Sequence, residues 1–186
     1  DFQSPFREVR AESVDAISFN LDLEKELNTK TSIFYGIEYL HNIVGSEGSE
    51  ENIETNENVR NVTRYPDGST WQSMAAYASL KHKPNSKFVL QTGLRFNQVI
   101  AKADFTENNA FLNLPFDDAE VNTGALTGTA GIIWSPSNLI QWKLNASTAF
   151  RAPNIDDIGK VFDSEPGSVV VPNKDLKAEY AYGGEL

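Results

Sequence analysis

The chain has 186 residues, and 26 Asp and Glu outnumber 16 Lys and Arg, giving a formal net charge of -10. This charge argues against nucleic acid as a partner, because binding to a phosphate backbone requires clustered Lys and Arg. The sequence has no cysteine, which removes disulfides, Cys-based zinc sites and thiol catalysis.

The hydrophobic content of 40% is too high for a disordered polymer, so a folded chain is expected. The sequence contains no run of eighteen apolar residues, which excludes a transmembrane helix. A transmembrane β-barrel is compatible with the mean hydropathy of -0.40, because its strands alternate apolar and polar residues.

The first predicted elements form a hairpin. Apolar and polar residues alternate with a period of two over residues 14–27, which is typical of a strand with one wet face. A short turn at 28–30 leads to a second strand that carries Ile33, Tyr35, Ile37 and Tyr39. Residues 45–68 follow as a long polar connection whose Glu-rich part, 46–58, is expected to be too polar to order itself alone.

The same alternation predicts five further strands. Trp71, Ala75 and Tyr77 mark the third strand, and the others lie near residues 88–97, 122–134, 140–150 and 176–186. Short turns are expected at 83–86 and 135–138, and long connections at 106–120 and 152–175. Short and long connections therefore alternate strictly along the chain.

This alternation predicts an all-β fold, an antiparallel up-and-down meander of about seven long strands with all long connections at one end. That layout is typical of an outer-membrane barrel. The lipid-facing residues are predicted to include Ile17, Phe19, Leu21, Ile140, Trp142 and Leu144. The lumen-facing residues are predicted to include Arg95, Asn97, Gln141, Lys143 and Asn145. A soluble antiparallel sheet with one wet face is the alternative.

An odd number of strands does not close a bacterial single-chain barrel, in which every edge must be paired. We therefore expect residues 1–186 to be part of a larger barrel.

Residues 144–153 end in Phe150, Arg151, Ala152 and Pro153, which resemble the Phe-Arg-Ala-Pro signature of TonB-dependent outer-membrane receptors. Residues 171–179, with Pro172, Asn173 and Leu176, resemble the Asn-Pro-Asn-Leu-Lys-Pro-Glu element that opens the next strand in that family. Both motifs are expected to be mainly structural. Phe150 completes the lipid-facing row, Arg151 brings a charge to the opposite face, and Pro153 ends the strand by removing a donor.

The resemblance implies a barrel of about 22 strands around an N-terminal plug, which imports a scarce nutrient across the outer membrane with energy from TonB. Lipid, TonB, the plug and a small-molecule nutrient would be its partners. A ferric siderophore ranks first as ligand, and cobalamin, haem and glycan follow. Haem ranks lower because residues 154–171 lack the histidine that some haem-importing members carry there. The alternative is a soluble exported β-sheet module that binds glycan or protein through its long loops.

The connection after Pro153 is the best candidate for ligand contact, and its candidate residues are Asp156, Asp157, Phe162 and Asp163. Clustered carboxylates could bind Ca²⁺, but a solvated loop is the favoured interpretation because no EF-hand spacing is present. His41 and His82 are predicted at opposite ends of the strands, which does not support one metal site or a catalytic cluster. No enzymatic activity, metal or cofactor is expected.

Overall fold

The computed structural model describes residues 4–60, 63–109, 114–160, 162–165, 168–170, 173 and 175–186. Its strands are β1 (Phe6–Asn28), β2 (Thr31–Asn52), β3 (Glu57–Arg60), β4 (Ser69–Asn85), β5 (Phe88–Asp104), β6 (Asp118–Ser137), β7 (Ile140–Arg151), β8 (Phe162–Glu165), β9 (Ser168–Val170) and β10 (Glu179–Glu185). One short helix, α2 (Ile155–Gly159), follows β7. No helix of the described residues is long and apolar enough to cross a membrane.

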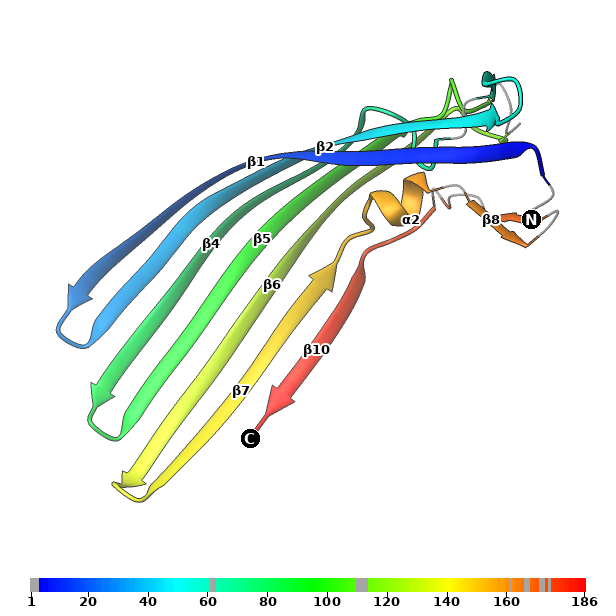
Figure 1. Cartoon of the computed structure of the whole chain (residues 1–186). Coiled ribbons are helices and arrows are strands. Elements are labelled where there is room, and N and C mark those ends of the chain that lie inside the picture. Colours follow the sequence, from blue (N-terminus) through cyan, green and yellow to red (C-terminus); the bar gives the residue numbers. More distant parts are fainter. Residues whose placement is uncertain are drawn as a thin grey trace.

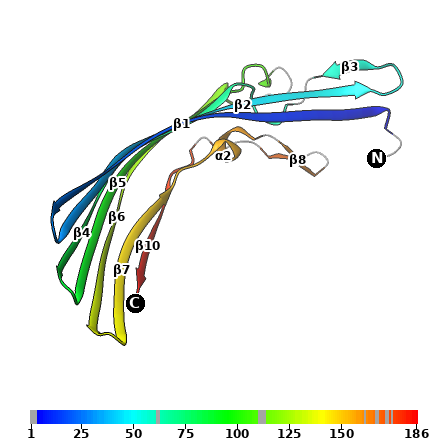
Figure 2. The ribbon, with the colours of Figure 1, turned by 60° about the vertical axis from the view of Figure 1, so that its left-hand side comes forward.

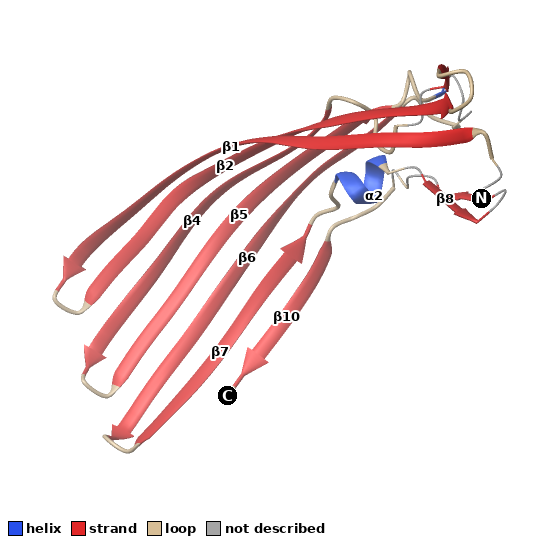
Figure 3. Cartoon of the chain, viewed as in Figure 1, coloured by secondary structure: helices blue, strands red, loops and turns tan. Residues whose placement is uncertain are grey.

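Eight of the strands form one curved antiparallel sheet in the order β1-β2-β4-β5-β6-β7-β10, with β3 paired to β2. The remaining two, β8 and β9, pair with each other as a separate two-stranded sheet. The short turns lie at one end of the sheet and the long connections at the other (Figures 1 and 3). The predicted all-β meander of seven long strands is therefore confirmed, with β3 as an addition. The sheet is open, and α2 lies on its concave side (Figure 2).

At the end of the sheet that carries the long connections, the strands are longer than the sequence predicted. Part of the expected connection 45–68 is strand, because β2 runs to Asn52 and β3 folds back on it. Residues 46–52 and 57–58 are therefore ordered as strand, but not alone, because β2 pairs there with both β1 and β3. The first half of β1 supplies the missing partner, and Arg7 forms an ion pair of 2.7 Å with Glu51 across the two strands.

The pairing register places the two predicted rows on opposite faces. One row across the sheet consists of Leu21, Ile37, Ala76, Phe96 and Leu126. The adjacent row consists of Asp22, Gly36, Tyr77, Arg95 and Thr127. In the hairpin of β6 and β7, Trp142 lies opposite Trp134 and Lys143 lies opposite Ile133. The predicted alternation of Trp142 and Lys143 between the faces is therefore confirmed.

The apolar row belongs to the convex face, and no described residue covers it. Leu94 is 60% exposed and Leu126 is 64% exposed. The concave face is polar near the short turns, where Arg95 contacts Glu38 by an ion pair and places its guanidinium 5.6 Å from the centroid of the Tyr77 ring. Tyr77 and the rest of the predicted row of the third strand, Trp71 and Ala75, lie on this concave face.

The polarity of the two faces reverses toward the long connections. There the concave face carries the buried residues Val99, Ala101 and Ala103, while Lys102 and Glu120 form an ion pair of 3.4 Å on the convex side. The buried side chains Ile155 and Ile158 of α2 pack on the concave side. One core cluster of the described residues contains Val44, Ala101, Val121, Ile155 and Ile158, with Tyr65 and Trp71 packed against it. A second contains Ala103, Phe105 and Ala119.

Gly36 occupies a position where a side chain has no room. A Cβ added there would lie 2.4 Å from the Leu21 carbonyl oxygen and 2.5 Å from the Tyr77 hydroxyl. We predict that Gly36→Ala lowers the unfolding free energy in detergent by about 1–3 kcal/mol, the usual cost of overpacking. Gly183→Ala is the matched control, because its nearest neighbour would be the Ser147 hydroxyl at 3.6 Å. Equal denaturation midpoints for the two variants would contradict the packing described for Gly36.

Candidate ligand-binding pocket at the loop end

The chain turns directly from β7 into α2. The strand ends at Arg151, Pro153 is buried, and Asn154 is the N-cap of the helix. The Asn154 side chain accepts a hydrogen bond of 2.9 Å from the Asp157 backbone, and the Asp157 carboxylate accepts one of 2.9 Å from the Asn154 backbone. This reciprocal capping box fixes where the helix begins.

Arg151 joins the two motifs that the sequence singled out. Its guanidinium lies 3.3 Å from the Asp157 carboxylate and 3.6 Å from that of Glu179, its partner residue on β10. On the opposite face, the rings of Phe150 and Tyr180 lie 6.2 Å apart. Because the Arg151 side chain is 61% exposed, we expect its ion pairs to orient the α2 segment more than to stabilise the fold.

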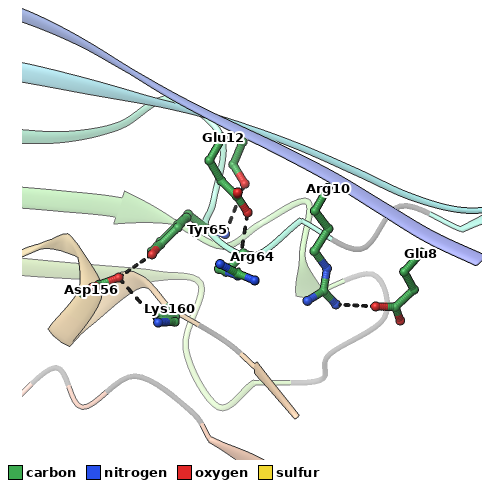
Figure 4. A network of polar contacts seen from close by, with 8 residues as sticks. Glu8, Arg10, Glu12, Arg64, Tyr65, Asp156 and Lys160 are labelled. Carbon is green, nitrogen blue, oxygen red and sulfur yellow. Dashed lines mark hydrogen bonds and ion pairs between the residues drawn. The ribbon is translucent and has the colours of Figure 1, made fainter.

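A second polar link ties α2 to the connection before β4. The Tyr65 hydroxyl donates a hydrogen bond to the Asp156 carboxylate, which also lies 3.9 Å from the Lys160 ammonium group. Burial and the hydrogen bond to Asp156 together raise the pKa of the Tyr65 hydroxyl to about 12. Figure 4 shows these contacts beside the ion pair of 3.7 Å between Arg64 and Glu12 of β1.

A pocket of about 540 Å³ opens between α2 and the concave face of the sheet. It is lined by Glu12, Val14, Leu40, Asn42, Val44, Tyr65, Trp71, Asn154, Ile155 and Asp156. Asn42 and Trp71 lie directly opposite each other on β2 and β4. The Asn42 Oδ1 and Trp71 Nε1 atoms are buried, and neither has a hydrogen-bond partner in the described part of the chain.

The residues predicted for ligand contact fall in different places. Asp156 and Asp157 lie on α2, and both carboxylates have the partners described above. Phe162 and Asp163 lie in β8, which pairs with β9, and their side chains are outside the described part of the structure.

The motif positions of the second element are only partly described. Pro172 lies outside the described residues. The Asn173 side chain accepts a hydrogen bond of 3.0 Å from the Asp175 backbone, and Leu176 is 38% exposed. The second motif thus enters β10 through an Asn-stabilised turn.

The two histidines are far apart, as predicted. His82 lies opposite Thr31 beside a short turn, whereas His41 lies opposite Gln72 toward the long connections. The His41 ring stacks on Tyr39 with an interplanar angle of 5°. Within the ranges that the structure describes, no group of three or more His, Cys, Asp or Glu side chains could hold a metal ion.

Long antiparallel strands with a bare apolar convex face and a partly polar concave face define a segment of a β-barrel wall. The family model described as "TonB dependent receptor-like, beta-barrel" matches residues 2–186. The chain therefore belongs to the TonB-dependent receptor family, whose members are receptors and transporters built on β-barrels of the outer membrane. No curated protein matches the sequence.

Solved structures share the fold at low sequence identity. The HasR hemophore receptor of Serratia marcescens, solved as a double mutant with its hemophore HasA and heme, superposes with a TM-score of 0.63 at 16% identity, over 96% of this chain and 29% of that one. The copper transporter OprC gives a TM-score of 0.61 at 14% identity, over 80% of this chain and 23% of that one. The unliganded ferric citrate transporter FecA gives 0.55 at 12% identity, over 78% and 21%. The chain thus spans less than a third of each of these proteins, 29% at most.

The Tyr65–Asp156 contact predicts a measurable titration. Asp156→Ala should lower the pKa of Tyr65 from about 12 toward its ordinary value of 10.0, because the accepting carboxylate and its charge are lost. Because the pKa of Tyr65 is raised in the folded protein, the contact contributes its full stabilisation of the fold below about pH 10. This stabilisation is lost as the pH rises through about 12. Tyrosine ¹³Cζ chemical shifts, assigned with Tyr65→Phe, report the titration. Glu179→Ala is the control, and an unchanged Tyr65 titration in Asp156→Ala would contradict the contact.

Proposed function

We propose that this chain forms part of the barrel wall of a TonB-dependent receptor in a bacterial outer membrane, which actively imports a scarce nutrient. The observation that carries the proposal is the convex apolar face, which spans strands far longer than a soluble sheet requires. In water this face would be an extended hydrophobic patch. In a bilayer it is the surface that contacts the acyl chains.

The aromatic residues beside the short turns support the same placement. Phe88, Trp134 and Trp142 occupy one convex row, and the rings of Phe88 and Trp134 lie 6.2 Å apart. Aromatic side chains of this kind concentrate at the boundary between acyl chains and headgroups. The short turns would then face the periplasm, and the long connections the outside of the cell.

A complete receptor of this kind needs parts beyond this segment of the barrel wall. We propose that other segments of the parent supply the plug, the TonB contact and the strands that close the barrel. Arg95, Lys143 and Asn145 on the concave face would line the lumen. Arg95 already pairs with Glu38 within the wall. We therefore expect it to contact the plug through hydrogen bonds and not as an unpaired positive charge.

A ferric siderophore is the ligand that we rank first, with cobalamin, haem and glycan as alternatives. The similar solved structures are a copper transporter, a hemophore receptor in complex with its hemophore and heme, and a ferric citrate transporter. These neighbours support a scarce metal or its complex as cargo. A soluble exported module that binds glycan or protein is the competing function. Recovery of the parent protein from the soluble fraction without detergent would favour that module.

We propose that the connection after Pro153 contacts the ligand through Asp156, Asp157, Phe162 and Asp163. The gathering of the long connections supports this, since the Asn108 side chain donates a hydrogen bond of 2.8 Å to Thr63 and Tyr65 contacts Asp156. Asp156 and Asp157 already hold partners in the wall. We therefore expect Phe162 and Asp163, in the β8–β9 hairpin, to contribute more to ligand contact than Asp156 and Asp157.

Deletion of residues 156–170 from the full-length receptor should abolish ligand binding at unchanged surface display. Phe162→Ala with Asp163→Ala is the milder variant, which leaves α2 intact and should weaken binding of the ferric siderophore about 10-fold or more, an effect of about 1.4 kcal/mol typical of a contact residue. Deletion of residues 53–56, at the tip of the β2–β3 arm, is the control. Unchanged affinity in the first two variants at normal display would refute the recognition role.

A further inference from the structure

We infer that an amide girdle on the convex face, formed by Gln72, Gln98 and Asn122, binds the sugar headgroup of a glycolipid. The lipid belongs to the membrane leaflet on the side of the long connections. This inference rests on the proposed function, because it takes the apolar convex rows as the surface that contacts acyl chains. It goes beyond that function by naming the chemistry of the lipid.

The amide girdle lies where the apolar part of the convex face ends. The convex residues change from Met74 to Gln72 along β4 and from Phe96 to Gln98 along β5. Gln98 follows Phe88 of the aromatic row by ten residues, which corresponds to about 25 Å across the membrane at the usual spacing and tilt of barrel strands. The apolar band of such barrels has the same height, about 25 Å. The amide girdle therefore lies at the second headgroup boundary.

The amides come from three neighbouring strands and offer hydrogen-bonding atoms to the convex surface. Gln72 and Asn122 lie on either side of Ile100 in one row across β4, β5 and β6. The Gln98 Nε2 group donates a hydrogen bond of 2.6 Å to Asn122 Oδ1. This bond leaves the Gln98 Oε1 acceptor and the Asn122 Nδ2 donor beside each other, and neither has a partner among the described residues. Gln98 Oε1 lies over Gly124, which has no side chain to cover it.

An adjacent donor and acceptor match the hydroxyl groups of a sugar. Each sugar hydroxyl can donate and accept, so two neighbouring hydroxyls can pair with both amide atoms at once. Asn122 is exposed and Gln98 is half-buried, so a headgroup beside the sheet can reach them.

The surrounding charges favour a sugar over the phosphate group of a phospholipid. Lys102 and Glu120, in the next convex row, form an ion pair of 3.4 Å. Asp104 and Asp118 lie opposite each other one row further, and their carboxylates would repel a phosphate. Phosphate recognition in proteins uses cationic donors, whereas the Lys102 ammonium group is already engaged.

Native mass spectrometry of the full-length receptor tests the inference, in micelles of a detergent that contains no sugar. Equal amounts of digalactosyl diacylglycerol and phosphatidylglycerol with the same acyl chains would be added, and the retained lipids counted. We expect the glycolipid to be preferred about 5-fold, the effect of about one net hydrogen bond. The double variant Gln98→Leu with Asn122→Leu should lose this preference.

The matched control is the double variant Gln91→Leu with Gln141→Leu, which removes two amides from the concave face and should keep the preference. Gln72→Leu, on β4, should lower the preference and is the second variant should the first fail to fold. Equal retention of the two lipids would overturn the inference, as would a preference that survives in Gln98→Leu with Asn122→Leu. Displacement of the glycolipid by free galactose would overturn the assignment to a lipid.

Failure of the inference and failure of the proposed function give different results. Equal retention of both lipids by a receptor that requires detergent would overturn the inference alone. Recovery of a receptor that is soluble without detergent and retains neither lipid would overturn the membrane placement and the inference together.

Discussion

The register of backbone hydrogen bonds between the long strands is the constraint on which the rest of the structure depends. Side chains alternate between faces, so a slip of one residue would exchange the convex and concave rows along a whole strand. Specific side chains oppose such a slip. The Tyr77 ring lies over Gly36, and Arg95 reaches from β5 across β4 to Glu38 on β2. Each contact requires its residues to share the concave face.

The same register gives the sheet two different ends. Near the short turns, the convex face is apolar and the concave face is polar, which suits lipid outside and water inside. Near the long connections, the concave face is apolar, and α2 covers part of it with Ile155 and Ile158. At the end of β7, Arg151 forms ion pairs with both Asp157 and Glu179, which orient the chain toward this apolar surface. A motif that ends a strand therefore also positions the wall of a pocket.

Period-two alternation was sufficient to predict the meander, the faces of Trp142 and Lys143 and the common end of the long connections. It could not predict that β2 continues to Asn52, because Arg7, the cation that pairs with Glu51 of this acidic segment, comes from the paired part of β1 and not from nearby sequence. The capping pair Asn154 and Asp157 is the local sequence signal for the start of α2. The pocket could not be predicted, because the meeting of Asn42, Tyr65 and Trp71 depends on register and on packing against α2.

The assignment of the convex face to lipid is tested most directly by spin-label accessibility along β7. These 186 residues contain no cysteine, so a single introduced cysteine has no competitor among them for the label. Labels would be placed at residues 140–147 of the full-length receptor in lipid vesicles, and their accessibility to oxygen and to a water-soluble nickel complex compared. We expect a period of two, with high oxygen accessibility at Trp142 and Leu144 and high nickel accessibility at Lys143 and Asn145. Uniform accessibility, or the opposite phase, would contradict the assignment of the convex face to lipid.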